Sequence, residues 1–147
     1  MTQPLSTLRL RIIVVGPPPG VRLQLQCGRH ELQPPTRQSQ AATTFDFEVR
    51  VGTRAGSQPN FLGAFAQGPP AGRFVYINSG TAAGQADSEW TRRAKVPLTG
   101  ITWALIERAR LAGSVLEAEI AGTGRDGGPA CATVPLLSGG WRVVDGN

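Results

Sequence analysis

The chain is poor in the residues that build metal centres and covalent active sites. It has one histidine, His30, and two cysteines, Cys27 and Cys131, among 147 residues. A structural zinc site needs four ligands, usually from two close pairs, and multi-histidine iron or copper sites need several imidazoles. Cys27 and His30 have no second pair to join. We therefore expect a strand-end cysteine and a loop histidine, with no metal, no cofactor and no catalytic residue.

Long apolar runs and lysine are also scarce. No apolar segment approaches the roughly 20 residues that span a bilayer, so no membrane association is expected. Arg9 and Arg11 interrupt the N-terminal apolar run in a way that a signal peptide does not tolerate, which predicts a cytoplasmic protein with reduced thiols. The net charge is +5 and Lys95 is the only lysine, but the arginines are scattered among predicted strands. Nucleic acid is therefore not expected as a partner.

Glycine and proline, by contrast, are abundant, with 19 and 12 residues. They place turns through much of a chain whose length suits one domain, 1–147. Alternating and unbroken apolar runs predict about six to eight strands. They fall at 8–14, 21–27, 45–51, 73–77, 95–98, 115–121, 131–137 and 141–144. One principal helix is expected at about 100–112, with Thr99 as its cap and Gly113 at its end.

The predicted fold class is α+β, mainly β, with an antiparallel sheet curled into a barrel or sandwich. Strands 8–14 and 21–27 are expected to pair, and 115–121 with 131–137 to form a hairpin. The GxGxxG spacing at 122–127 lies at the tip of that hairpin, and it is interpreted as a turn because no helix follows it. The expected core face of the helix consists of Ile101, Leu105, Ala109 and Ala112.

Three longer motifs carry a resemblance to a known family. They are PNFLGAFAQGPPAGRFVYINSG, AKVPLTGITWALIE and DGGPACATVPLL. With them the chain resembles a family of small bacterial proteins classed as a domain of unknown function, over nearly its whole length. The resemblance implies a bacterial, single-domain protein and implies no activity, so it transfers no catalytic residue.

The best candidate for a functional site is the irregular segment 78–95. Small polar donors near glycines can grip a polar or anionic ligand, while cations supply charge and an indole supplies a stacking face. The candidate ligand-binding residues are Asn78, Ser79, Thr81, Gln85, Trp90, Arg92, Arg93 and Lys95. The alternative is an ordered loop that covers one end of the barrel.

Three classes of function remain open. The preferred hypothesis is a non-enzymatic domain that binds a small polar or anionic ligand, or a protein partner, through the 78–95 loop. The second is a hydrolase or isomerase with paired carboxylates, which requires two of them in one cleft and a raised pKa. Its candidates are Asp46, Glu48, Asp87 and Glu89. The third is an interaction protein or homo-oligomer that uses Trp103, expected on the helix face opposite the core.

Overall fold

The structure of the chain is a computed structural model. It describes residues 6–16, 21–26, 32–39, 41–51, 61–62, 65–67, 72–81, 91–98, 100–112, 114–122, 132–133 and 136–144. In chain order the elements are β1 (Ser6–Val15), β2 (Val21–Gln26), β3 (Leu32–Gln33), β4 (Arg37–Gln38), β5 (Ala42–Val51), β6 (Phe61–Leu62), β7 (Phe65–Gln67), β8 (Gly72–Thr81), β9 (Thr91–Pro97), α1 (Trp103–Ala112), β10 (Val115–Ala121), β11 (Ala132–Thr133) and β12 (Leu137–Val144). Seven of these strands have six or more residues. That number agrees with the prediction of about six to eight.

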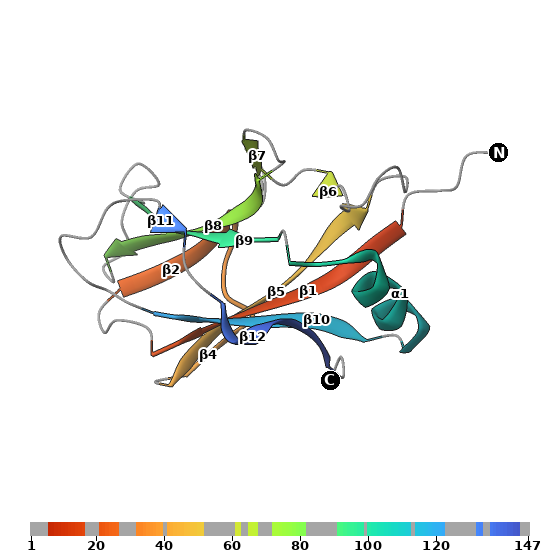
Figure 1. Cartoon of the computed structure of the whole chain (residues 1–147). Helices are drawn as coiled ribbons and strands as arrows, with labels where there is room; N and C mark the ends of the chain where they lie inside the picture. The colour runs from red at the N-terminus through yellow and green to blue at the C-terminus, as the bar shows by residue number, and fades with distance from the viewer. Residues whose placement is uncertain are drawn as a thin grey trace.

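The strands form two sheets that face each other as a sandwich, and the mainly β, α+β class is confirmed (Figure 1). Sheet A has the order β12-β10-β1-β5-β4, with β6 also paired to β5. Sheet B has the order β11-β9-β8-β2-β3, with β7 also paired to β8. The sandwich is therefore the correct alternative of the two architectures predicted, because the sheets do not close into a barrel.

The core between the sheets is made by the alternation that the sequence shows. Leu10 and Ile12 of β1 are fully buried, as is Phe45 of β5, and Leu25 and Val75 meet them from sheet B. Successive side chains of a strand point to opposite faces, so one apolar face from each sheet suffices to build this core. The polar face of each sheet then points outward.

The predicted pairing of the first two strands is wrong. β1 pairs with β5 in antiparallel register and with β10 in parallel register, whereas β2 pairs with β8 and β3 in the other sheet. Two consecutive strands that each have one apolar face can bury these faces in two ways. They can lie side by side in one sheet, or they can face each other across the core from opposite sheets. Here β1 and β2 belong to opposite sheets, which is a choice that alternation alone does not make.

The predicted hairpin of 115–121 with 131–137 is also wrong, and the sheets are mixed rather than antiparallel throughout. β10 lies between β1 and β12, and β11 forms a parallel pair with β9. The parallel pair of β1 and β10 requires a long connection, which the chain has because most of sheet B lies between these strands in sequence. In the GxGxxG segment, the Gly122 amide donates to the Val15 carbonyl at 2.7 Å, and 123–127 lie outside the described residues.

The helix α1 begins three residues later than predicted and closes the end of the sandwich where β1 and β10 begin (Figure 1). Its cap is Thr102, whose hydroxyl accepts a hydrogen bond from the Leu105 amide at 3.2 Å, while the predicted cap Thr99 lies outside the described residues. Among the helix residues whose side chains are described, Ile106 and Ala109 are buried. Trp103 packs against the core one turn before Ile106, so its predicted position opposite the core face is corrected.

Strand β12, at the edge of sheet A, carries an irregularity that directs a tryptophan inward. The register between β10 and β12 shifts between Glu117 and Glu119, and on β12 Gly139 and Gly140 have φ of +87° and +103°. Glycine adopts these angles without steric strain, so the strand can bulge here. Trp141 follows directly, is 7% exposed, and donates its indole N–H to the Pro97 carbonyl of β9 at 3.0 Å. It thereby links the edge of sheet A to sheet B.

Candidate functional site

The segment 78–95 is not one irregular loop. Strand β8 continues to Thr81 and β9 begins at Thr91, so the predicted site residues fall mainly on two paired strands. Asn78, Ser79 and Thr81 lie on β8, and Arg92, Arg93 and Lys95 lie on β9. Gln85 and Trp90 lie outside the described residues. The loop was predicted too long because polar residues on the outer face do not interrupt a backbone ladder whose inner face is apolar.

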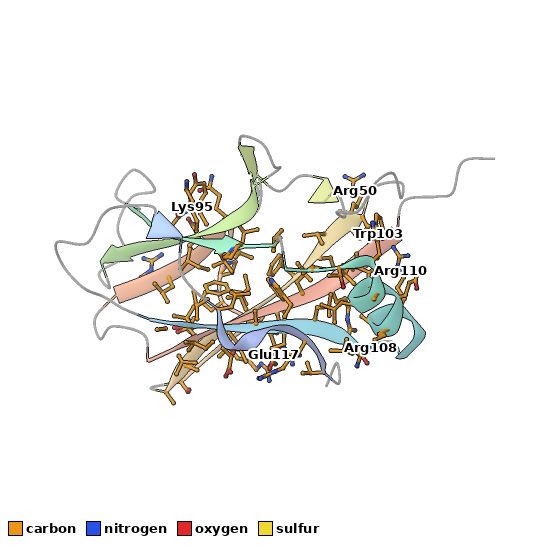
Figure 2. All side chains as sticks on the ribbon, in the orientation of Figure 1. Arg50, Lys95, Trp103, Arg108, Arg110 and Glu117 are labelled. Atoms are coloured by element: carbon orange, nitrogen blue, oxygen red, sulfur yellow. The ribbon has the colours of Figure 1, made fainter. Side chains whose placement is uncertain are left out.

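The register brings part of the predicted site together. Asn78 lies opposite Arg92 of β9, with a register irregularity just before it, and Lys95 lies opposite Tyr76. Since residues two apart on a strand share a face, Tyr76, Asn78 and Lys95 belong to the same outer surface. Figure 2 shows the Lys95 side chain on the side of sheet B that faces away from sheet A.

Strand β2 adds two glutamines to this surface. Their side chains point outward, whereas the leucines of β2 point into the core. Gln24 lies opposite Asn78, and Gln26 lies opposite Tyr76. The resulting group is called the sheet B polar face, and its members are Gln24, Gln26, Tyr76, Asn78 and Lys95. The first two were missed by the sequence analysis. The alternation Leu23-Gln24-Leu25-Gln26 places both amides on one outward face, but it does not say which strand lies beside them.

Asn78 is at the centre of this polar face and is 3% exposed. Its Nδ2 donates to Gln24 Oε1 and to Gln26 Oε1, each at 3.1 Å, and the two acceptors define the orientation of the amide. In the part of the chain that the structure describes, its Oδ1 is buried without a hydrogen-bond partner. Such an oxygen loses about 1–3 kcal/mol of solvation and is therefore rare unless a water or a ligand meets it.

The outer face of sheet A holds a second polar group, which is a row of alternating charges across four strands. Arg11 of β1 lies in register with Asp46 of β5 and with Glu117 of β10, which lies opposite Arg142 of β12. Arg11 Nε donates to Asp46 Oδ1 at 2.6 Å, and Arg11 Nη1 donates to Glu117 Oε2 at 3.4 Å. Figure 2 shows Glu117 on the side of sheet A away from sheet B. We call these four residues the charge row.

At the β12 end of the charge row, Arg142 is a second arginine that contacts Glu117. Arg142 Nη2 lies 2.8 Å from Glu117 Oε1 and 3.4 Å from Glu119 Oε1. Arg11 is only 7% exposed, and Glu117 is also buried. A buried charge is tolerated when it is paired and hydrogen-bonded, and here each carboxylate oxygen of Glu117 has its own guanidinium partner.

Pairing within this row outweighs burial in setting the pKa values. Burial alone would raise the pKa of Asp46, but hydrogen bonds from Arg11 and from the Thr36 hydroxyl, together with the charges of Arg11 and Arg37, hold that pKa below its usual range. Burial would likewise lower the pKa of Arg11, yet its contacts with Asp46 and Glu117 raise it. Asp46 is therefore an ionised structural carboxylate.

These pairings bear on the hypothesis of a carboxylate-based enzyme. A general acid needs a raised pKa, and the pKa of Asp46 is lowered by its arginine partner. Its neighbour Glu48 is exposed and lies opposite Arg9, while Asp87 and Glu89 lie outside the described residues. The partner of Asp46 is Arg11 on the neighbouring strand.

Stability is expected to fall in acid because of Asp46. A carboxylate whose folded pKa is below its unfolded value of about 3.9 stabilises the fold above that pH and loses this contribution as the pH falls through the folded pKa. In Asp46→Asn, the free energy of unfolding from urea denaturation should therefore decline less below about pH 4. The difference should be about 1 kcal/mol after solvent screening. Glu48→Gln, which removes an exposed carboxylate from the same face, is the control and should keep the wild-type decline. An unchanged acid profile in Asp46→Asn would contradict the assignment.

Within the residues that the structure describes, no group of three or more His, Cys, Asp or Glu side chains is placed to hold a metal ion. Cys27, His30 and Cys131 lie outside those residues. Among the described residues, no helix has the length and the apolar character to cross a bilayer.

The fold and these two polar surfaces define a small, mainly β sandwich domain with one buried amide cluster and one buried charge row. The chain belongs to the family of unknown function DUF5990, whose model matches residues 8–144. The resemblance to a family of unknown function is therefore confirmed. Comparisons with curated proteins and with solved structures gave no match.

Proposed function

We propose that the protein is a non-enzymatic domain that binds a small polar ligand at the sheet B polar face. The observation that carries this proposal is the buried Oδ1 of Asn78, which accepts no hydrogen bond within the described residues. Because Nδ2 of the same amide is held by Gln24 and Gln26, the free oxygen has a defined direction. This oxygen is enclosed, so a ligand meets it only when its cover moves, and a ligand that then donates an N–H or O–H to it recovers the lost hydrogen bond.

The charge of the surface indicates the rest of the ligand. Lys95 is half-buried on the same face, and Arg92 lies opposite Asn78 in register. Lys95 adds positive charge next to the amide cluster, which favours a ligand with an anionic group. The proposed ligand class is thus a small molecule in which a donor group and an anionic group are close together, such as a hydroxy acid or an amino acid. Bacterial origin and a cytoplasmic location remain part of the proposal and rest on the sequence.

The test compares probes that differ by one feature. Lactate has a hydroxyl donor and a carboxylate, acetate has the carboxylate alone, and glycerol has hydroxyls without charge. We expect lactate and serine to shift the side-chain amide resonances of Asn78, Gln24 and Gln26 saturably in nuclear magnetic resonance titrations. Acetate and glycerol should bind at least about tenfold more weakly. Acetate lacks the hydroxyl that donates to Asn78, and glycerol lacks the carboxylate that contacts the positive charge.

Two variants locate the binding. Asn78→Ala should abolish the saturable shifts, and Lys95→Met should weaken lactate while it leaves the amide hydrogen bonds in place. Gln38→Ala removes an exposed amide from sheet A and is the matched control, for which wild-type affinity is expected. The proposal is wrong if lactate and serine produce no saturable shift, or if Lys95→Met and Asn78→Ala both bind them as the wild type does.

A further inference from the structure

The outer face of sheet A is hollowed next to the charge row. The concavity has a volume of about 550 Å³. Its floor comes from β1 and β10, and its wall comes from β4, β5 and the residues between these two strands. Its lining includes Arg11, Ile13, Arg37, Ala42, Thr44 and Glu117. It lies on the other sheet from the sheet B polar face and has no residue in common with it.

Two hydrogen-bond donors at this concavity have no partner within the described chain. Arg11 uses Nε for Asp46 and Nη1 for Glu117, and its Nη2 makes no hydrogen bond with any described residue. Thr44 is buried, and its carbonyl accepts from Thr36, but its hydroxyl is bonded to none of the described residues. Neither atom is among the fully enclosed ones without a partner, and both residues line the concavity.

A second guanidinium lies at the rim. Arg37 Nη2 is 3.7 Å from Asp46 Oδ2, and its side chain is 59% exposed, so it can turn toward a ligand without loss of a short hydrogen bond. Arg11 and Arg37 thus contact different oxygens of the Asp46 carboxylate, and both line the concavity. Two guanidinium groups in this arrangement are a common means of holding a planar carboxylate.

The surrounding charge tolerates an anion, and the surface is partly apolar. The arginines Arg11, Arg37 and Arg142 are matched by the carboxylates Asp46, Glu117 and Glu119, so the region is neutral before a ligand binds. Ile13 and Ala42 supply apolar lining next to the free donors. The aliphatic part of an organic ligand can pack against them. An inorganic anion such as phosphate gains nothing from this apolar surface, and its higher charge is repelled more strongly by the Glu117 carboxylate.

We propose that this concavity is a binding site for a small organic carboxylate, with the head group on Arg11 Nη2, Arg37 and the Thr44 hydroxyl and the short aliphatic chain on Ile13 and Ala42. Arg11 serves two purposes in this site. Its Nε and Nη1 belong to the charge row, which holds the guanidinium in place, and its Nη2 meets the ligand. The site is thereby pre-organised, which limits the conformational entropy lost on binding.

The experiment titrates the full-length protein with butyrate at constant ionic strength and follows backbone amide resonances of Ile13 and Thr44. Arg37→Gln should weaken butyrate about tenfold through loss of one charge-assisted contact, and Thr44→Val about threefold through loss of a neutral one. Neither variant touches the contacts of Arg11 with Asp46 and Glu117. Arg108→Gln removes an exposed arginine from α1 and should leave the affinity unchanged.

The outcomes separate the site from its ligand class and from the proposed function. Saturable binding of butyrate that is weakened by Arg37→Gln and Thr44→Val, and retained in Asn78→Ala, supports the inference. Tighter binding of inorganic phosphate than of butyrate would overturn the ligand class. No saturable shift, or equal affinity in both variants and the wild type, would overturn the site itself. None of these results depends on whether lactate binds the sheet B polar face.

Discussion

Replacement of Arg11 by methionine is expected to lower the free energy of unfolding by about 3–5 kcal/mol, the usual effect of removing one partner of a buried ion pair. The substitution retains the length of the side chain but removes the charge between Asp46 and Glu117. Among the described residues, Asp46 then retains the more distant Arg37 and the Thr36 hydroxyl, and Glu117 retains Arg142. Urea denaturation followed by circular dichroism measures the loss.

The chain provides a close control for this prediction. Arg9 is on the same strand and the same face, two residues earlier, but it is exposed. Arg9→Met should change the stability by no more than about 0.5 kcal/mol, as is usual for surface positions. Addition of Asp46→Asn to Arg11→Met should recover part of the loss, because it removes one uncompensated carboxylate. Equal effects of Arg9→Met and Arg11→Met would show that burial of the charge row has no energetic consequence.

Replacement of Trp141 by alanine is expected to destabilise the protein by about 3–5 kcal/mol, the range for a buried aromatic truncated in a core. Trp141 belongs to the main hydrophobic cluster, and its indole lies against Gly100, where a Cβ would be 3.5 Å from Cδ1. Its loss would leave a cavity in the core and free the Pro97 carbonyl. Thermal and chemical unfolding of the purified variant measure the effect.

Two further variants separate packing from hydrogen bonding at this position. Trp141→Phe retains an aromatic ring and removes the N–H donor to Pro97, so it should cost about 1–3 kcal/mol and less than alanine. Trp103→Ala removes a tryptophan that is only half-buried against the same core, and it should cost less than Trp141→Ala. A larger loss in Trp103→Ala would mean that α1, rather than the edge strand β12, closes the core.

Much of the element pattern was predictable because it depends on neighbouring residues. Leu8 to Ile12 and Phe45 to Val51 alternate with polar residues, and both segments lie in strands with the expected side buried. The partners of those strands were not predictable in this way. β1 lies between β5 and β10, and its neighbour in sequence, β2, lies in the opposite sheet. Alternation shows that a face is apolar, and many arrangements can bury that face.

The candidate site shows the same division. Asn78 and Lys95 were named from the polar composition of their segment, and the structure places them on one face of sheet B with Gln24 and Gln26 from a distant strand. Arg11 was seen as one polar residue in an alternating strand, and nothing in the local sequence distinguishes it from Arg9. Its burial follows from Asp46 and Glu117, which come from strands 35 and 106 residues away.

The sequence alone therefore determined a mainly β fold, its main strands and helix, and which side of several strands is apolar. Those properties depend on the two-residue period of a strand and on local turn chemistry, which act over a few residues. Only the tertiary structure decided which strands are neighbours, which arginine is buried, and which amide oxygen lacks a partner. Each of these depends on side chains from distant segments meeting across a sheet, and on how well the whole chain covers its polar faces.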